Sequence, residues 1–208
     1  MFKTLRQAAA SVVCMTLHTE LTDAAGAAAL VVDGVTPAEL SGPTPCDEWD
    51  VQALLNHIIL WSSHSLEARA QGESVAPELM ERDFAAAPDF ADAYRAQLDR
   101  ALAAWAEPAV WDRELDMMGT KTPAANDGAL IIAELVLHGW DLAAATGQDY
   151  AVSDRAAEAA LGAVEANAEI FRQYKGFADP VPTAADAPIL DRVLALSGRN
   201  PAWTPSAH

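Results

Sequence analysis

A glutamate and a histidine lie four residues apart in the segment Glu134-Leu-Val-Leu-His138. Residues at this spacing project from the same face of an α-helix, so the carboxylate and the imidazole can bind one divalent cation together. Residues 131–132 and 135–137 around the pair are apolar, and a charged glutamate in such a setting is costly unless it is paired or bound to a metal. The spacing therefore predicts two ligands of a metal site, with an i,i+4 surface pair as the alternative.

A third ligand must come from another helix, and His57 is the candidate. It lies within the apolar run of residues 54–59, where a neutral imidazole needs a polar partner. A histidine bonded to a backbone carbonyl is the alternative interpretation. Three protein ligands leave coordination positions open, which is typical of reactive metal sites rather than closed structural ones.

Three further residues are candidates for the lining of the metal pocket. Trp61 and His64 follow His57 by four and seven positions, so a helix places them on the same stripe. His64 is interpreted as a proton shuttle or an extra ligand, with a solvated histidine as the alternative. Asp141 follows His138 by three positions and is predicted either to orient a ligand from behind or to bond to a neighbouring segment.

Other residues have both a structural and a functional interpretation. No basic residue adjoins Cys46 in the sequence to activate it, so we interpret it as a small buried hydrophobe. Met117 and Met118 either line the pocket mouth or fill gaps in the core. Arg172 and Lys175 either hold an anionic substrate or complement the C-terminal end of a helix.

Apolar residues recur at helical spacing along almost all of the segments that must position these residues. Residues 111–121 are irregular, with room for a short extended piece. Long helices without strand pairs predict an all-α, up-and-down four-helix bundle with an additional C-terminal helix and tail. The helices are expected over residues 16–32, 50–70, 90–105, 122–147, 153–174 and 189–196.

Capping residues mark several of these helix ends. Asp50 and Ser153 have the side chains of N-caps. Thr122 is predicted to be a third N-cap, followed by Pro123 in the first helical turn. Gly147 is predicted to end that helix in the left-handed conformation.

The composition indicates one generous domain. The chain has 208 residues, of which 51% are hydrophobic, and 13 Lys and Arg against 30 Asp and Glu give a net charge of −17. Such a charge repels nucleic-acid backbones and anionic lipids. Two cysteines, no apolar run approaching the roughly 18 residues of a membrane span and a poor match to a signal peptide predict a cytoplasmic protein. Met15 is an alternative start to Met1.

Three separated motifs carry a family resemblance. They are residues 43–57 (Pro-Thr-Pro-Cys-Asp-Glu-Trp-Asp-Val-Gln-Ala-Leu-Leu-Asn-His), residues 134–147 and residues 191–203 (Asp-Arg-Val-Leu-Ala-Leu-Ser-Gly-Arg-Asn-Pro-Ala-Trp). In this order they resemble the actinobacterial DinB-like metal-binding proteins, relatives of the N-terminal domain of mycothiol-dependent maleylpyruvate isomerase. The resemblance implies a four-helix bundle that binds one divalent metal, Zn²⁺ or another such as Ni²⁺. The ligands that it implies are His57, Glu134 and His138.

The resemblance also implies thiol chemistry, because several relatives use a low-molecular-weight thiol such as mycothiol or bacillithiol. The expected protein is a metal-dependent enzyme, a thiol S-transferase or isomerase-like, that acts on a small-molecule thiol and an electrophilic substrate. The isomerase has a further C-terminal α/β lobe with a catalytic arginine, whereas only about sixty residues follow residue 147 here, mostly the helix over residues 153–174 and the tail. The alternatives are a metal-binding or partner-binding bundle without catalysis and a metal-dependent hydrolase.

The expected organisation is a single bundle with short flanking segments. Residues 1–15 are interpreted as an N-terminal extension, for which disorder is one alternative. Residues 16–203 form the DinB-like metal-binding bundle, and residues 204–208 form a tail. The sequence leaves a monomer and a homodimer equally open.

Overall fold

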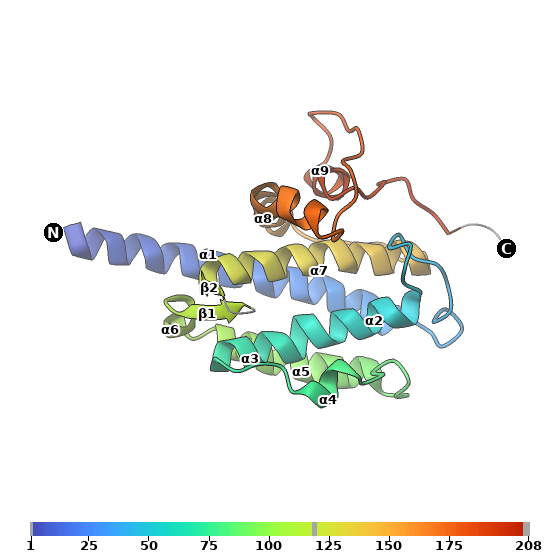
Figure 1. Ribbon diagram of the computed structural model, residues 1–208, viewed down its shortest axis with the longest axis horizontal. Coiled ribbons are helices and arrows are strands. Elements are labelled where there is room, and N and C mark those ends of the chain that lie inside the picture. The colour runs from blue at the N-terminus through green and yellow to red at the C-terminus, as the bar shows by residue number, and fades with distance from the viewer. Residues whose placement is uncertain (1, 118–119, 206–208) are drawn as a thin grey trace.

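The computed structural model describes residues 2–117 and 120–205, and most of these residues are helical (Figure 1). The prediction of an all-α, DinB-like bundle is confirmed; the described chain adds one two-stranded antiparallel hairpin. In chain order the elements are α1 (Phe2–Gly34), α2 (Val51–Ile59), the π-helical turn η1 (Leu60–His64), α3 (Ser65–Gln71), α4 (Pro77–Met80), α5 (Phe90–Trp105), α6 (Pro108–Trp111), β1 (Glu114–Met117), β2 (Thr120–Pro123), α7 (Ala124–Thr146), α8 (Asp154–Gln173) and α9 (Ile189–Leu196).

Four long helical segments form the bundle: α1, the continuous α2–η1–α3 segment, α5 and α7. They close a ring in which α1 packs against α5 and α7, α2 packs against α7, and α3 packs against α5. Helix α8 packs on α7 and α1 from outside this ring, and α9 packs on α8 (Figure 1). The C-terminal addition to the bundle is therefore a pair of helices.

The helix directions depart from a simple up-and-down succession at one step. Ser62 contacts Tyr94, and Leu66, farther along the same segment, accepts a hydrogen bond from Trp105, farther along α5. The α2–α3 segment and α5 therefore run parallel. The connection over residues 72–89, which contains α4, carries the chain back along the bundle between them (Figure 1).

Two helix starts differ from those that the sequence predicts. Helix α1 begins at Phe2 rather than at Thr16, so the backbone of the predicted N-terminal extension continues the first helix. Helix α7 begins at Ala124, because Pro123 is held in an extended conformation by its pairing with Glu114 in the hairpin. The prediction of Thr122 as an N-cap is therefore wrong, whereas a short extended piece does form in this region.

The other predicted caps are confirmed. The carboxylate of Asp50 accepts a hydrogen bond from the backbone N–H of Ala53 at 2.8 Å, and the hydroxyl of Ser153 accepts one from Ala156. Gly147 ends α7 with a φ of +66°, a conformation in which a side chain would be strained. Asp50 thus fixes one end of α2 and Gly147 one end of α7, the two helices that carry the candidate ligands.

Helix α7 lies at the centre of the fold, between α1, α2 and α8. Among the described residues it is the one helix long and apolar enough to cross a membrane, and 67% of its most apolar window is buried inside the protein. The core helix of a bundle has the same length and composition, so this feature carries no membrane assignment. The burial of α7 instead explains why its residues are apolar on almost every side of the helix.

The π-helical turn η1 interrupts the second helical segment and begins three residues after His57. The hydroxyls of Ser62 and Ser63 donate to the carbonyl oxygens of Ile58 and Ile59, each at 2.6 Å. Such bonds from a side chain to the preceding turn compete with the helical ladder and distort it. A π-helical turn holds one residue more than an α-helical turn, so the residues after it are rotated off the stripe that an α-helix would give them.

A close approach of two elements predicts the effect of substituting Gly139. A Cβ atom at this position of α7 would lie 2.7 Å from the hydroxyl oxygen of Tyr150, which donates to the carbonyl of Leu135 at 2.9 Å. We expect Gly139→Ala to lower the free energy of unfolding by about 1–3 kcal/mol, because the phenol must move and lose its hydrogen bond.

Gly162→Ala is the matched control. Gly162 lies in the exposed face of α8, and a Cβ atom there meets no other atom within 4 Å. This variant should raise the free energy of unfolding by about 0.5–1 kcal/mol, the ordinary gain from alanine in a helix. Chemical denaturation of both variants beside the unaltered protein measures the difference, and equal stabilities of the two variants would contradict the packing argument.

Candidate metal centre

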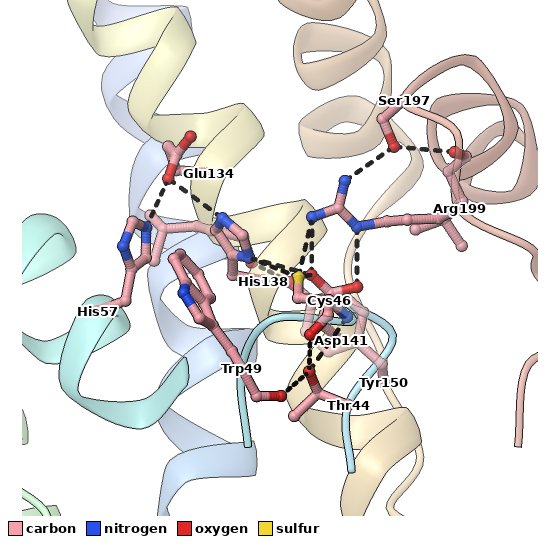
Figure 2. Close-up of polar contacts among 12 residues, drawn as sticks. Thr44, Cys46, Trp49, His57, Glu134, His138, Asp141, Tyr150, Ser197 and Arg199 are labelled. Carbon is pink, nitrogen blue, oxygen red and sulfur yellow. Dashed lines mark hydrogen bonds and ion pairs between the residues drawn. The ribbon is translucent and has the colours of Figure 1, made fainter. Parts of the chain in front are cut away.

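The three predicted ligands lie together where α2 faces α7 (Figure 2). The Nε2 atom of His57 lies 3.1 Å from Oε2 of Glu134, and Nε2 of His138 lies 3.4 Å from the same oxygen. One donor atom from each of the three residues falls within 4.8 Å of the others. The structure therefore brings together residues from α2 and α7 that are 77 positions apart in sequence.

The donor set fits a divalent ion. Two imidazole nitrogens and a carboxylate oxygen are ligands that zinc and similar metals prefer. Donor atoms around a tetrahedral Zn²⁺ lie about 3.3 Å apart, given metal–ligand bonds of about 2.0–2.1 Å. The separations of 3.1 and 3.4 Å between the carboxylate oxygen and the two imidazole nitrogens match that spacing.

The three side chains tune one another electrostatically. Burial disfavours the charged form of Glu134, but hydrogen bonds and charge attraction from His138 and His57 outweigh it and hold the pKa of Glu134 well below its usual range. Burial lowers the pKa of His57. Although burial has the same effect on His138, hydrogen bonds with Asp141, Cys46 and Glu134 raise the pKa of His138 well above its usual value.

A turn before α2 covers the ligands. The buried hydroxyl of Thr44 lies 3.0 Å from the carbonyl oxygen of Cys46 and 2.8 Å from that of Trp49, and it accepts a hydrogen bond from the backbone N–H of Cys46. This turn sets the indole of Trp49 against both imidazoles, with ring centroids 4.6 Å from His57 and 5.6 Å from His138. The indole therefore shields one side of the ligand cluster (Figure 2).

A second polar group lies behind His138. The Nδ1 atom of His138 donates to Oδ2 of Asp141 at 3.0 Å. The guanidinium of Arg199 binds the same carboxylate through two atoms, Nε to Oδ1 at 2.8 Å and Nη2 to Oδ2 at 2.7 Å. Asp141 is fully buried, and the Arg199 side chain is 9% exposed. Burial would raise the pKa of Asp141, but Arg199 and His138 lower it to about 2.

Cys46 belongs to this second group. Its thiol donates to Oδ2 of Asp141 at 3.2 Å and lies 3.8 Å from Nη2 of Arg199. Cys46, His138 and Asp141 also have the spacing of a metal-binding set. Arg199 already occupies both oxygens of Asp141, however, so the set that contains Glu134 is the better candidate for a metal site.

The ligands open onto a cavity of about 530 Å³ between the turn before α2 and the chain that follows α8. Its size lies within the range of small-molecule sites. The wall carries aromatic side chains beside cationic and anionic ones, and the candidate metal ligands form one end of it. The lining includes Cys46, Asp47, Glu48, Trp49, His57, Glu134, His138, Phe171, Arg172, Lys175, Phe177 and Arg199.

Two of the three predicted pocket residues lie at the candidate ligands, namely Trp61 and Asp141, and His64 does not. Trp61 lies beside His57, with ring centroids 6.3 Å apart, and lines a smaller cavity on the far side of the ligands. Asp141 contacts His138 as described. The structure does not bring His64 to the cluster: its ring stacks on Phe84 at 5.2 Å, because the π-helical turn rotates it off the stripe of His57.

Two residues of the site were not predicted from the sequence. Cys46 is half-buried and hydrogen-bonded at the cavity wall, so its interpretation as a buried hydrophobe is wrong. The basic residue beside it, Arg199, is 153 positions away and belongs to the motif of residues 191–203, which did not indicate this contact. Arg172 and Lys175 both line the cavity, and Arg172 donates to the carbonyl oxygens of Ala178 and Leu196. The side chains of Met117 and Met118 lie outside the described residues.

Comparison with known proteins identifies the class. The family model of the mycothiol maleylpyruvate isomerase N-terminal domain matches residues 21–143, and the chain belongs to this family. Two curated Mycobacterium tuberculosis proteins, the uncharacterized protein MT0763 of strain CDC 1551 and the uncharacterized protein Rv0738 of strain H37Rv, are each 28% identical to this chain. Each alignment covers 82% of this chain and 91% of the relative. No solved structure matches the chain.

The cluster makes a direct prediction about metal content. His57→Ala and His138→Ala should each lose most of the bound metal, because each removes one of three protein ligands. Metal analysis of the purified proteins after dialysis against zinc measures the loss. His64→Ala, which alters a histidine outside the cluster, is the control and should keep its metal. A full equivalent of metal in both ligand variants would contradict the site.

The electrostatics predict a proton release on metal binding. At neutral pH the metal-free protein carries a charged His138 and a neutral His57, given their raised and lowered pKa values. A metal at Nε2 of His138 displaces one proton, so affinity should fall about tenfold for each pH unit below neutrality, and more steeply once His57 is also protonated. Calorimetric titration with Zn²⁺ in buffers of different ionisation enthalpy counts the protons. A release near zero or near two at pH 7 would contradict this assignment.

Proposed function

We propose that this protein is a metal-dependent enzyme that transfers a low-molecular-weight thiol, such as mycothiol, to an electrophilic substrate. His57, Glu134 and His138 hold one divalent ion, with Zn²⁺ as the first candidate. The observation that carries the proposal is the position of these ligands at the end of a 530 Å³ cavity, which gives a thiol and a second substrate room to meet. A divalent ion there lowers the pKa of a thiol that binds it, so the sulfur reacts as a thiolate.

The charges of the site support an anionic partner. Glu134 and Asp141 carry two negative charges and Arg199 carries one positive charge. With both histidines neutral, a divalent ion would leave these groups with one positive charge in excess. A thiolate compensates that charge, whereas a neutral ligand leaves it unbalanced.

The cavity wall supports two substrates rather than one. The indole of Trp49 screens the ligands from one side, and the rings of Phe171 and Phe177, 4.9 Å apart, form an apolar patch across the cavity. Lys175 and Arg172 lie beside this patch at the same wall. Such a wall binds the body of an organic electrophile while the metal end holds the thiol.

The membership of the family points to the thiol. The family description names mycothiol, and the matched residues 21–143 contain all three ligands. The matched region ends before the segments that form the rest of the cavity wall, which are the end of α8 with the chain after it and residues 197–199 after α9. We therefore expect the thiol to be that of the family and the electrophile to be set by the C-terminal segment.

The decisive experiment is a conjugation assay on the zinc-loaded protein with mycothiol and a panel of electrophilic acceptors. Thiol-dependent conjugation supports the proposal. Metal binding without turnover would favour a non-catalytic bundle, and thiol-independent hydrolysis would favour a metal-dependent hydrolase, so either result would overturn it.

Glu134→Gln separates metal ligation from a simple salt bridge. Glutamine keeps the shape but removes the negative charge, so zinc affinity should fall at least about tenfold and conjugation should fall with it. The metal-free variant should stay helical by circular dichroism. Glu165→Gln, on the exposed face of α8, is the matched control and should bind zinc as the unaltered protein does. Equal zinc affinities of the two variants would remove Glu134 from the site.

A further inference from the structure

We propose that Arg199 is a positioning residue for the metal ligand His138 and acts on it through Asp141. This inference rests on the metal site proposed above and extends that site to a residue outside the matched region 21–143. In one chain of contacts, the guanidinium binds the carboxylate, the carboxylate binds the imidazole, and the imidazole faces Glu134 (Figure 2).

The geometry fixes the orientation of the His138 ring. Asp141 accepts a hydrogen bond from Nδ1 at 3.0 Å, which places the proton on that nitrogen and turns Nε2 toward Glu134, 3.4 Å away. A carboxylate behind a metal-binding histidine commonly fixes the tautomer and the ring plane in this way. Asp141 can do so only while its own carboxylate is held in place.

Arg199 holds that carboxylate with a two-point contact. Its Nε and Nη2 atoms donate to the two oxygens of Asp141 at 2.8 and 2.7 Å, a fork that a lysine cannot reproduce. Its third nitrogen, Nη1, donates to the hydroxyl of Ser197 at 3.1 Å, so the guanidinium itself has a fixed plane. Because the carboxylate is fully buried, no water can replace this contact cheaply.

The C-terminal end of α9 is built to deliver this side chain. The backbone N–H of Arg199 donates to the carbonyl of Leu194 and that of Gly198 to Ala195, the two hydrogen bonds of a Schellman cap. Gly198 has a φ of +88°, and a Cβ atom there would lie 2.7 Å from the side chain of Ala178. This position therefore requires glycine both for its left-handed backbone and for the close approach of Ala178. The cap directs the next residue, Arg199, back toward α7.

The inference gives the C-terminal helices a role in the metal site. Helix α9 contacts the bundle through α8, so the position of Arg199 depends on the packing of α8 on α7. A metal site built on α2 and α7 alone would contain every ligand, but the carboxylate of Asp141 would lose its arginine partner and keep only the contacts with His138 and Cys46.

The test measures metal affinity rather than turnover. Arg199→Met removes the fork and keeps most of the side-chain volume, and its Zn²⁺ affinity, measured against a chromogenic chelator, should be about 10–100-fold weaker. The visible absorption spectrum of the Co²⁺-loaded variant should also change, because it reports the arrangement of the ligands. Arg199→Lys should restore affinity only in part, since lysine keeps the charge but not the two-point contact. Arg192→Met, an equivalent change in α9 at a side chain with no hydrogen bond or ion pair in the described chain, should leave both measurements unchanged.

A double variant guards against misfolding. Arg199→Met leaves a buried charge, so the pair Asp141→Asn with Arg199→Met removes both charges together and should fold, as judged by thermal melting of the metal-free protein. It should bind zinc as weakly as Arg199→Met alone. If the folded double variant and Arg199→Met both bind zinc within about twofold of the unaltered protein, with an unchanged cobalt spectrum, the positioning role is wrong and the metal site stands. If the unaltered protein binds neither metal, the proposed function fails, and this inference fails with it.

Discussion

Two carboxylates, Glu134 and Asp141, lie two turns apart on α7 with His138 between them, and compensation of their charge is the constraint on which the site depends. A buried carboxylate is stable only with a cation or several donors beside it. Arg199, in the C-terminal segment, forms an ion pair with Asp141, and the imidazoles of His57 and His138 contact the carboxylate of Glu134. In the metal-free protein the raised pKa of His138 supplies a further positive charge between the two carboxylates.

This arrangement divides the site into a reactive side and a supporting side. The side chain of Glu134 remains 38% exposed because it faces the cavity, whereas Asp141 is fully buried. The imidazole of His138 connects the two through its two nitrogens. At neutral pH a cation at the reactive side would displace only the proton on Nε2 of His138. The proton on Nδ1 would remain, because it is hydrogen-bonded to Asp141. The same network would thus support the proposed metal binding and preserves the apolar packing of α7.

The fold follows closely from local sequence signals, and its exceptions have physical causes. Helical periodicity and the caps at Asp50, Ser153 and Gly147 locate the long helices. The hairpin moves the start of α7 beyond Pro123, because strand pairing overrides a plausible N-cap. The parallel course of α5 depends on the path of residues 72–89, which no periodic pattern encodes. The helical stripe that residue spacing predicts does not continue across the π-helical turn, so His64 lies off the stripe of His57 and against Phe84.

The sequence by itself determined the helical class, the family and the three candidate ligands, because each depends on residue type and on spacing within one helix or one motif. Glu134 and His138 share a helical turn, and the motif that ends at His57 supplies the third ligand. Only the tertiary structure decided which residues support those ligands. Arg199 and Cys46 meet at Asp141 across 58 and 95 positions of sequence. The contact of Arg199 depends on the packing of α9 on α8 and of α8 on α7, and that of Cys46 depends on the turn before α2, and no local pattern specifies either.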